Sequence, residues 1–153
     1  MTAPLTILYA EDDEGHATLV RRNLGRTALA SDAVHVRDGQ EALDYMYRRG
    51  PWSRRTPHDA LLILLDLNMP RLGGLDVLDA LKQDARLAHI PVFVLTTTDN
   101  PTELDRCYAR GAAACLVKPL DYGSFGDMVR RLADFLATAR MPSETQPHSA
   151  HVS

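Results

Sequence analysis

The chain has 153 residues, with 17 lysines and arginines against 20 aspartates and glutamates, which gives a formal net charge of -3. Its 45% apolar and 24% charged residues are typical of a soluble globular domain, and this length predicts one domain. The mildly acidic balance argues against binding to nucleic acid through a basic face. No segment approaches the roughly 18 consecutive apolar residues of a membrane helix. The N-terminus resembles no secretion signal, and Cys107 and Cys115 resemble no disulfide framework, so we expect a cytoplasmic protein.

Five short apolar runs are predicted to form strands: Leu5–Ala10, Ala33–Val36, Leu61–Leu65, Val92–Leu95 and Ala114–Val117. The third and fourth runs are almost continuously apolar, as in strands that helices cover on both faces. Between the runs, apolar residues recur at helical spacing, which predicts five helices. The strand–helix alternation therefore predicts an α/β fold with a doubly wound, five-stranded parallel sheet. The helical positions are Ala17, Val20 and Leu24; Ala42, Leu43, Met46 and Tyr47; Leu75, Leu78 and Leu81; Leu104 and Tyr108; and Phe125, Val129, Leu132 and Leu136.

Two segments fall outside this alternation. Residues 48–58 contain four arginines, two prolines, one glycine and the only tryptophan, and we expect them to form an ordered surface loop. Residues 142–153 have almost no apolar side chains, which is typical of a disordered segment. We therefore expect a folded domain over residues 4–140 and a disordered tail over residues 141–153.

Polar side chains follow four of the five predicted strands, at the end of the sheet where α/β proteins place their sites. Asp66 and Thr96 are 30 residues apart, and Thr96 and Lys118 are 22 apart, about one strand–helix unit each. We expect the acidic side chains to lie together, with Thr96 and Lys118 at the rim. The residues in question are Glu11, Asp12 and Asp13 after the first strand, Asp66 after the third, Thr96 after the fourth and Lys118 after the fifth.

Carboxylates crowded in this way require a compensating positive charge. A hard divalent cation such as Mg2+ supplies that charge and prefers oxygen ligands. The metal, a lysine and a threonine hydroxyl can together hold the oxygens of a transferring phosphoryl group. The residues therefore favour phosphoryl transfer onto a carboxylate, and Asp66 is the best-placed acceptor.

Each of these residues also has a purely structural explanation. Acidic residues after a strand often cap the next helix, and we expect Asp13 to do only that. A lone aspartate at a strand end is more often a cap or a turn former than a nucleophile. A lysine before a proline is usually a surface residue, and a run of threonines is usually a loop. The joint placement of these residues at successive strand ends favours the functional explanation.

The segments around these residues resemble the receiver domain of two-component response regulators. The resemblance covers about residues 4–140 and implies the flavodoxin-like (βα)5 receiver fold. It also implies a signalling phosphoacceptor that catalyses only its own phosphorylation and slow dephosphorylation. The matching segments are ILYAEDD (Ile7–Asp13), LLILLDLNMP (Leu61–Pro70), IPVFVLTTTD (Ile90–Asp99) and LVKP (Leu116–Pro119), with DGQEAL (Asp38–Leu43) as a structural match.

Carried over by position, the resemblance assigns the acidic residues. Asp66 is expected to accept phosphate from a phosphohistidine of a sensor histidine kinase. Glu11 and Asp12 resemble the acidic pair that holds Mg2+ together with Asp66, with Asp12 as the more direct ligand. Asn68 is expected to give its backbone carbonyl to the metal.

The resemblance also assigns the residues that respond to the phosphate. Thr96 resembles the switch threonine whose hydroxyl binds the phosphoryl oxygen, and Lys118 resembles the lysine that pairs with the phosphate. The family's Lys-Pro bond is cis, which implies a cis bond before Pro119. Receivers commonly carry an aromatic residue at the position of Cys115, so the resemblance does not carry over the usual aromatic switch movement to this chain. They also commonly carry a small residue where this chain has Thr97.

The interval from Asp12 to Asp66 is 54 residues, longer than in many receivers, and the excess falls in Arg48–His58. In this loop the chain resembles single-domain receivers that work with phytochrome-type photosensor histidine kinases. The four loop arginines are either a contact for an acidic kinase surface or solvated charge. They are Arg48, Arg49, Arg54 and Arg55.

Met128 and Phe135 lie beside the apolar stripe of the last helix and widen its apolar surface. A surface wider than one helix face favours self-association. We therefore expect a homodimer through the fourth helix, fifth strand and fifth helix, a surface that receivers often use.

Other functions fit the residues less well. A receiver without an output domain can instead act as a phosphate relay or sink toward a histidine phosphotransfer protein. A phosphatase with Asp66 as nucleophile usually needs a second carboxylate two residues later, where this chain has Asn68. A flavin carrier would need a phosphate-cradling loop after the first strand, and Glu11, Asp12 and Asp13 would repel phosphate there. Because only a short segment follows the receiver, we expect no DNA-binding output domain, and we also expect no membrane partner.

Overall fold

A computed structural model describes residues 5–25 and 31–145. They form one parallel sheet of five strands in the order β2-β1-β3-β4-β5. In this order β1 and β3 are neighbours at the centre of the sheet, so the winding reverses there. The predicted doubly wound α/β fold is therefore confirmed. The strands are β1 (Leu5–Ala10), β2 (Ser31–Val36), β3 (Leu61–Asp66), β4 (Val92–Thr96) and β5 (Ala114–Val117).

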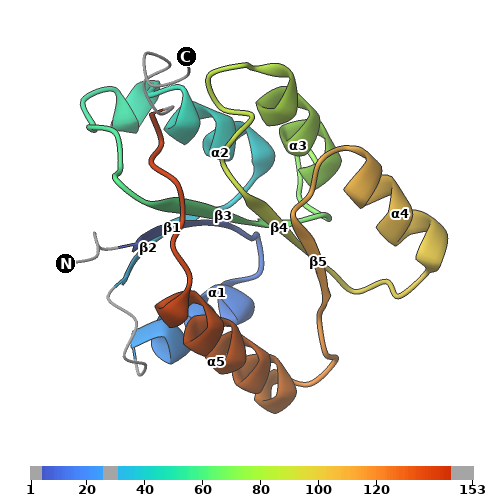
Figure 1. The fold of residues 1–153 in the computed structure, drawn as a ribbon. Helices are drawn as coiled ribbons and strands as arrows, with labels where there is room; N and C mark the ends of the chain where they lie inside the picture. Colours follow the sequence, from blue (N-terminus) through green and yellow to red (C-terminus); the bar gives the residue numbers. More distant parts are fainter. Residues whose placement is uncertain (1–4, 26–30, 146–153) are drawn as a thin grey trace.

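The helices cover both faces of the sheet (Figure 1). One apolar cluster lies on the side of α1 and α5 and includes Ile7, Tyr9 and Phe125. The other lies on the side of α2 and α3 and includes Leu8 and Leu78. No helix in the described part of the chain is long and apolar enough to cross a membrane. The helices are α1 (Glu14–Gly25), α2 (Gly39–Met46), the short 3-10 helix η1 (Gly50–Trp52), α3 (Gly74–Gln83), α4 (Pro101–Ala109) and α5 (Tyr122–Thr138).

The central strand β3 is buried along its whole length, because the sheet covers its edges and helices cover its faces. Its end is joined closely to α3 through Gly74. A Cβ atom at Gly74 would lie 2.5 Å from the backbone oxygen of Asp66, closer than real Cβ atoms come to such an atom. A glycine is therefore required for α3 to begin directly beside the residue that ends β3.

The chain beyond α5 differs from the prediction of a disordered tail. It crosses the sheet from the α5 side to the α2 side (Figure 1). The oxygen of Pro142 accepts a hydrogen bond from the Leu61 amide (3.1 Å), and the Glu144 amide donates to the oxygen of His58 (2.9 Å). The prediction is wrong for residues 141–145, because these backbone bonds and a buried ion pair hold them. The predicted tail over residues 146–153 lies outside the described residues.

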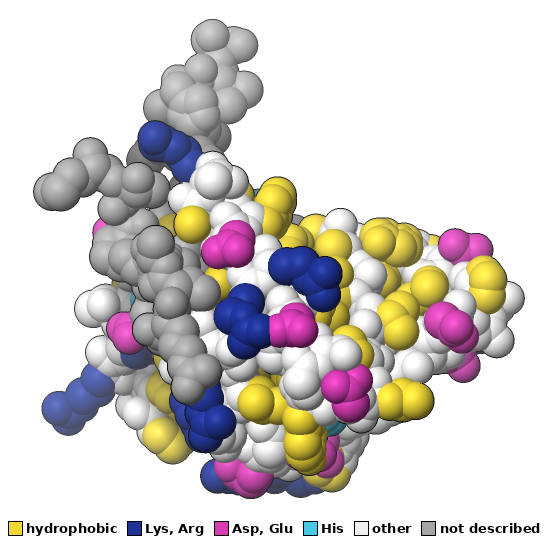
Figure 2. Space-filling model, turned by 90° about the horizontal axis from the view of Figure 1, so that it is seen from below, with side chains coloured by type: hydrophobic (Ala, Val, Ile, Leu, Met, Phe, Trp, Pro, Cys, Tyr) yellow, Lys and Arg dark blue, Asp and Glu magenta, His cyan; other side chains and the backbone are white. Residues whose placement is uncertain are grey.

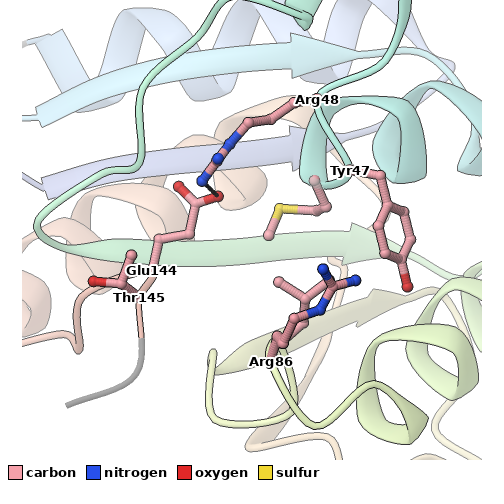
Figure 3. A pocket seen from close by; sticks show the side chains of 7 residues that line it. Tyr47, Arg48, Arg86, Glu144 and Thr145 are labelled. Atoms are coloured by element: carbon pink, nitrogen blue, oxygen red, sulfur yellow. Dashed lines mark ion pairs between the residues drawn. The ribbon is translucent and has the colours of Figure 1, made fainter. Parts of the chain in front are cut away.

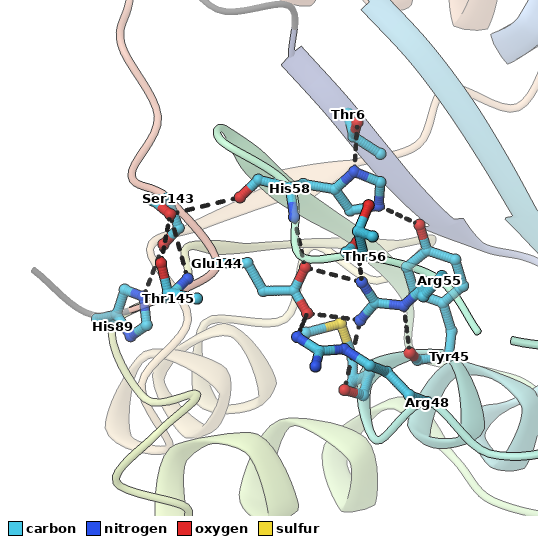
Figure 4. A network of polar contacts seen from close by, with 11 residues as sticks. Thr6, Tyr45, Arg48, Arg55, Thr56, His58, His89, Ser143, Glu144 and Thr145 are labelled. Atoms are coloured by element: carbon cyan, nitrogen blue, oxygen red, sulfur yellow. Dashed lines mark hydrogen bonds and ion pairs between the residues drawn. The ribbon is translucent and has the colours of Figure 1, made fainter. Parts of the chain in front are cut away.

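That ion pair joins Glu144 to Arg55 of the arginine-rich loop (Figure 4). Arg55 donates to both carboxylate oxygens of Glu144 at 2.5 and 2.8 Å, and the His58 amide donates to one of them at 2.9 Å. Arg55 also lies over the ring of Tyr45, with its guanidinium carbon 4.2 Å from the ring centre. Its side chain is only 10% exposed, so for Arg55 both expectations, kinase contact and solvated charge, are wrong.

Beside this ion pair lies a pocket of about 350 Å3, which Tyr47, Arg48, Arg86 and Glu144 line (Figure 3). Its arginines already face carboxylates. Arg86 bonds Asp84 at 3.1 Å, and Arg48 lies 3.7 Å from Glu144. The pocket therefore offers no arginine without an acidic neighbour, and we assign it no ligand.

Candidate functional site

The acidic side chains predicted to meet do so at the carboxyl end of β1 and β3. Glu11, Asp12 and Asp66 each offer an oxygen that lies within 4.8 Å of the other two. Glu11 and Asp66 are buried and Asp12 is exposed. The strand order causes this meeting, because β1 and β3 are hydrogen-bonded neighbours whose ends lie side by side.

Lys118 lies deeper than the predicted rim position. It is only 5% exposed, and its ammonium group donates to Glu11 Oε1 at 2.5 Å and to Asp66 Oδ2 at 2.6 Å. Its long side chain reaches both carboxylates from the end of β5. The expectation of a rim lysine is wrong. Among the described residues, the acidic partners of the ammonium group are Glu11 and Asp66, and both are buried, so the lysine must be buried to reach them.

The buried cluster changes the protonation of its members. Burial, the largest cause, and the neighbouring Asp66 together raise the pKa of Glu11 to about 8, although Lys118 acts to lower it. Burial alone would lower the pKa of Lys118, but its bonds to Asp66 and Glu11 raise it instead. Lys118 is therefore charged at neutral pH and provides the positive charge that this crowded site requires.

A divalent metal fits the donor set. Three carboxylates from two neighbouring strand ends offer oxygen ligands within reach of one centre. Hard cations such as Mg2+ and Mn2+ take this kind of ligand, and a bound cation would supply positive charge to incoming phosphoryl oxygens. Glu11, Asp12 and Asp66 are thus the residues that would hold such an ion.

Asn68 and Thr96 border this cluster. The Asn68 backbone amide donates to Asp66 Oδ1 at 2.9 Å, which folds the loop after β3 back toward the Asp66 carboxylate. Thr96 is buried at the end of β4, and its hydroxyl accepts from the Thr98 amide at 3.2 Å. Thr97, next along the chain, is exposed.

Asp13 does what was expected of it. Its carboxylate accepts from the His16 amide at 3.0 Å, and its backbone oxygen accepts from Ala17 at 3.0 Å, so it caps α1. The backbone bond between Lys118 and Pro119 differs from the implied cis form, because the described residues contain no cis peptide. The trans form is the more stable isomer, and the Lys118 ammonium reaches both carboxylates with it.

Three residues around Glu11 were not singled out from the sequence. Tyr9 donates its hydroxyl to Glu11 Oε1 (2.9 Å), and His35 Nε2 lies 2.7 Å from the Glu11 backbone oxygen. His16 Nδ1 lies 3.5 Å from both Glu11 Oε1 and Lys118 Nζ. The i, i+2 spacing of Tyr9 and Glu11 could have indicated their contact, since alternate residues of a strand share a face. The two histidines come from α1 and β2, and only the fold brings them here.

A five-stranded α/β sheet with acidic residues and a lysine gathered at its carboxyl end defines a class of signalling domain. The chain matches the response regulator receiver domain over residues 7–130. It therefore belongs to the response regulator receiver family, as its motifs implied.

Among curated proteins, the chain is 37% identical over 131 residues to the probable methanogenesis regulatory protein FilR2 of Methanothrix harundinacea. That alignment covers 86% of this chain and 81% of FilR2. The chain is also 31% identical over 141 residues to the response regulator Rcp1 of Synechocystis. This second alignment covers 92% of the chain and 95% of Rcp1.

Solved structures give the same picture. The phosphorylated cyanobacterial phytochrome response regulator RcpA is similar with a TM-score of 0.84 at 32% identity, covering 92% of this chain and all of RcpA (100%). The Mn2+-bound form of Rcp1 also reaches 0.84 at 31% identity, with 91% of this chain and 99% of that one covered. A cyanobacterial phytochrome response regulator is thus among the proteins that this chain is similar to.

Proposed function

We propose that this protein is a single-domain response regulator that accepts a phosphoryl group from a sensor histidine kinase onto Asp66. The observation that carries the proposal is the contact of Lys118 with both Asp66 and Glu11. The ammonium group of Lys118 lies directly beside the Asp66 carboxylate. An aspartate held in this way can attack a phosphohistidine while positive charge balances the phosphoryl oxygens. The chain then catalyses only its own phosphorylation and slow hydrolysis.

The reaction is proposed to depend on Mg2+, held by Glu11, Asp12, Asp66 and the backbone carbonyl of Asn68. The geometry of the three carboxylates and the Mn2+-bound structure of Rcp1 support a divalent ion. Thr96 is proposed to bring its hydroxyl to the phosphoryl oxygen and Lys118 to pair with it. In the unphosphorylated chain both side chains are bonded elsewhere, Thr96 to Thr98 and Lys118 to the carboxylates.

The partner is proposed to be a phytochrome-type photosensor kinase in the cytoplasm. Support comes from RcpA, described as a phytochrome response regulator, and from a similar regulator, RPA3017, in red light signalling of R. palustris. Output would come through protein contacts, without nucleic acid or membrane. A relay or sink toward a histidine phosphotransfer protein uses the same Asp66 chemistry and is the second candidate. A phosphatase is disfavoured by Asn68, because the carboxamide side chain at this position cannot serve as a general acid or base.

Incubation with Mg2+ and a small phosphodonor tests the acceptor directly. We expect intact mass measurement to show an adduct of about 80 Da, the mass of one phosphoryl group, that EDTA abolishes. Asp66→Asn should show none, because an amide cannot form the acyl phosphate. Asp13→Asn is a matched control, since the Asp13 side chain caps α1 and an asparagine can also cap a helix, and it should be phosphorylated normally. An unchanged adduct in Asp66→Asn would rule out Asp66 as the acceptor.

The chain is further proposed to form a homodimer through α4, β5 and α5. Exposed hydrophobic residues gather on these elements, and Figure 2 shows hydrophobic side chains toward the side on which Figure 1 places β5 and α4. We expect sedimentation at micromolar concentration to give a dimer, and Phe135→Glu to give a monomer. A monomer in the wild type, with and without phosphorylation, would refute this. The exposed residues are Tyr108, Val117, Leu120, Tyr122 and Phe135.

A further inference from the structure

Tyr9 is a buried tyrosine whose hydroxyl points at the acidic cluster. It lies on β1, is 1% exposed, and packs with Ile7 and Phe125 in the cluster between the sheet and α1 and α5. A buried phenol needs a hydrogen-bond acceptor. Tyr9 finds it in Glu11 Oε1 at 2.9 Å, two residues along the chain.

The backbone of Glu11 is already fixed from β2. Its amide donates to the oxygen of Val36 (3.0 Å), and its own oxygen lies 2.7 Å from His35 Nε2. A carbonyl only accepts, so His35 carries its hydrogen on Nε2, and Nδ1 is free to accept from Arg21 at 3.4 Å. With the backbone of Glu11 held, the orientation of its carboxylate is the remaining freedom, and Tyr9 acts on that.

Tyr9 and Lys118 share the same oxygen of Glu11 but differ in charge. The Lys118 ammonium, 2.5 Å from Oε1, repels an incoming cation. The Tyr9 hydroxyl is a neutral donor and does not repel a cation. A carboxylate has two oxygens, so Tyr9 can hold Oε1 while Oε2 is turned toward a cation.

We propose that Tyr9 is a positioning residue of the metal site, whose hydroxyl holds the Glu11 carboxylate in the orientation that a divalent cation uses. This inference rests on the proposed function, since it takes Glu11 as a metal ligand. Mg2+ demands near-octahedral geometry, whereas Ca2+ tolerates flexible ligands. A carboxylate held in one orientation therefore favours Mg2+ over Ca2+.

Calorimetric titration of the unphosphorylated full chain with Mg2+ and with Ca2+ tests the proposal. We expect Tyr9→Phe to weaken Mg2+ binding by about 10–100-fold, the usual effect of removing a residue that orients a metal ligand. Ca2+ binding should weaken less, so the Mg2+/Ca2+ preference falls. Tyr45→Phe is the matched control, because Tyr45 is also buried (3% exposed) but bonds His58 on the other side of the sheet. It should leave both affinities unchanged.

A second comparison separates positioning from a general loss of stability. In a Glu11→Gln background, Tyr9→Phe should cause no further loss of Mg2+ affinity, because its effect passes through the Glu11 carboxylate. An unchanged Mg2+ affinity in Tyr9→Phe, or an equal loss in Tyr45→Phe, would overturn the inference. The proposed function would still stand in that case if the wild-type chain were phosphorylated. A wild-type chain that binds no Mg2+ would overturn both.

Discussion

Lys118→Ala is expected to lower the free energy of unfolding of the metal-free protein at neutral pH by about 3–5 kcal/mol, the usual cost of removing one partner of a buried ion pair. The ammonium bonds Glu11 and Asp66 in a site where all three side chains are less than a tenth exposed. Without it, the acidic side chains of Glu11 and Asp66 are left in a buried site without a cation. The loss should be measured by urea unfolding of the metal-free chain.

Added Mg2+ should recover most of that loss, because the variant's uncompensated carboxylates bind the cation and binding to the folded state stabilises it. Lys118→Met, which keeps the apolar stem and removes only the charge, should lose as much stability as Lys118→Ala. If Lys118→Met keeps wild-type stability, packing of the stem and not the charge explains the effect.

The same variant tests the proposed role of Lys118 after phosphorylation. We expect Lys118→Ala to accept some phosphate on Asp66, seen by intact mass, because the acceptor and the acidic pair remain. Its amide hydrogen exchange should not change on phosphorylation, since the pairing that couples the phosphate to β5 is absent. A wild-type exchange response in Lys118→Ala would contradict this role.

Glu144→Ala is expected to destabilise the protein by about 3–5 kcal/mol, again the cost of leaving a buried charge unpaired. Glu144 is 4% exposed, and its carboxylate accepts hydrogen bonds from two guanidinium nitrogens of Arg55 and from the backbone amide of His58. Removing the carboxylate leaves the Arg55 guanidinium buried without an anion and releases residues 141–145 from the sheet. Urea unfolding measures the loss.

The exposed pair of Asp127 and Arg130 is the matched control for this prediction. Both side chains are about half exposed (54% and 44%), so Asp127→Ala should cost no more than about 1 kcal/mol. In a double-mutant cycle, Arg55→Met combined with Glu144→Ala should lose less than the sum of the two single changes, because no charge is left unpaired. If Glu144→Ala lowers the free energy of unfolding as little as Asp127→Ala does, the segment after α5 does not stabilise the fold.

The same contacts determine how the contribution of Glu144 to the free energy of unfolding depends on pH. Burial alone would raise the pKa of Glu144, but its bonds to Arg55 and His58 hold the pKa below the usual value of 4.5. A lowered folded-state pKa means that the unfolded chain takes up this proton first as pH falls. The contribution of Glu144 is therefore fully present above about pH 4.5 and is lost as pH falls through the folded-state pKa, so Glu144→Ala should show a weaker acid dependence in that range.

The strands were predictable because each is a short apolar run between helical repeats. β1 and β5 begin and end where predicted, and β3 was extended by only one residue, Asp66. The meeting of Glu11, Asp12 and Asp66 was also predictable, since parallel strands end on one edge of the sheet. The depth of Lys118 was not, because a lysine before a proline looks like a surface residue in sequence.

The sequence by itself determined the sheet, the helices around it, the family and the acidic residues at its carboxyl end. The spacing of apolar residues and the polar residues at strand ends are local patterns in the sequence. They do not depend on how the strands and helices are arranged in space. Only the tertiary structure decided that Lys118 lies between Glu11 and Asp66 and that Glu144 pairs with Arg55. The Lys118–Glu11 and Arg55–Glu144 contacts join residues 107 and 89 positions apart, and strand order and helix packing, which no local pattern encodes, bring them together.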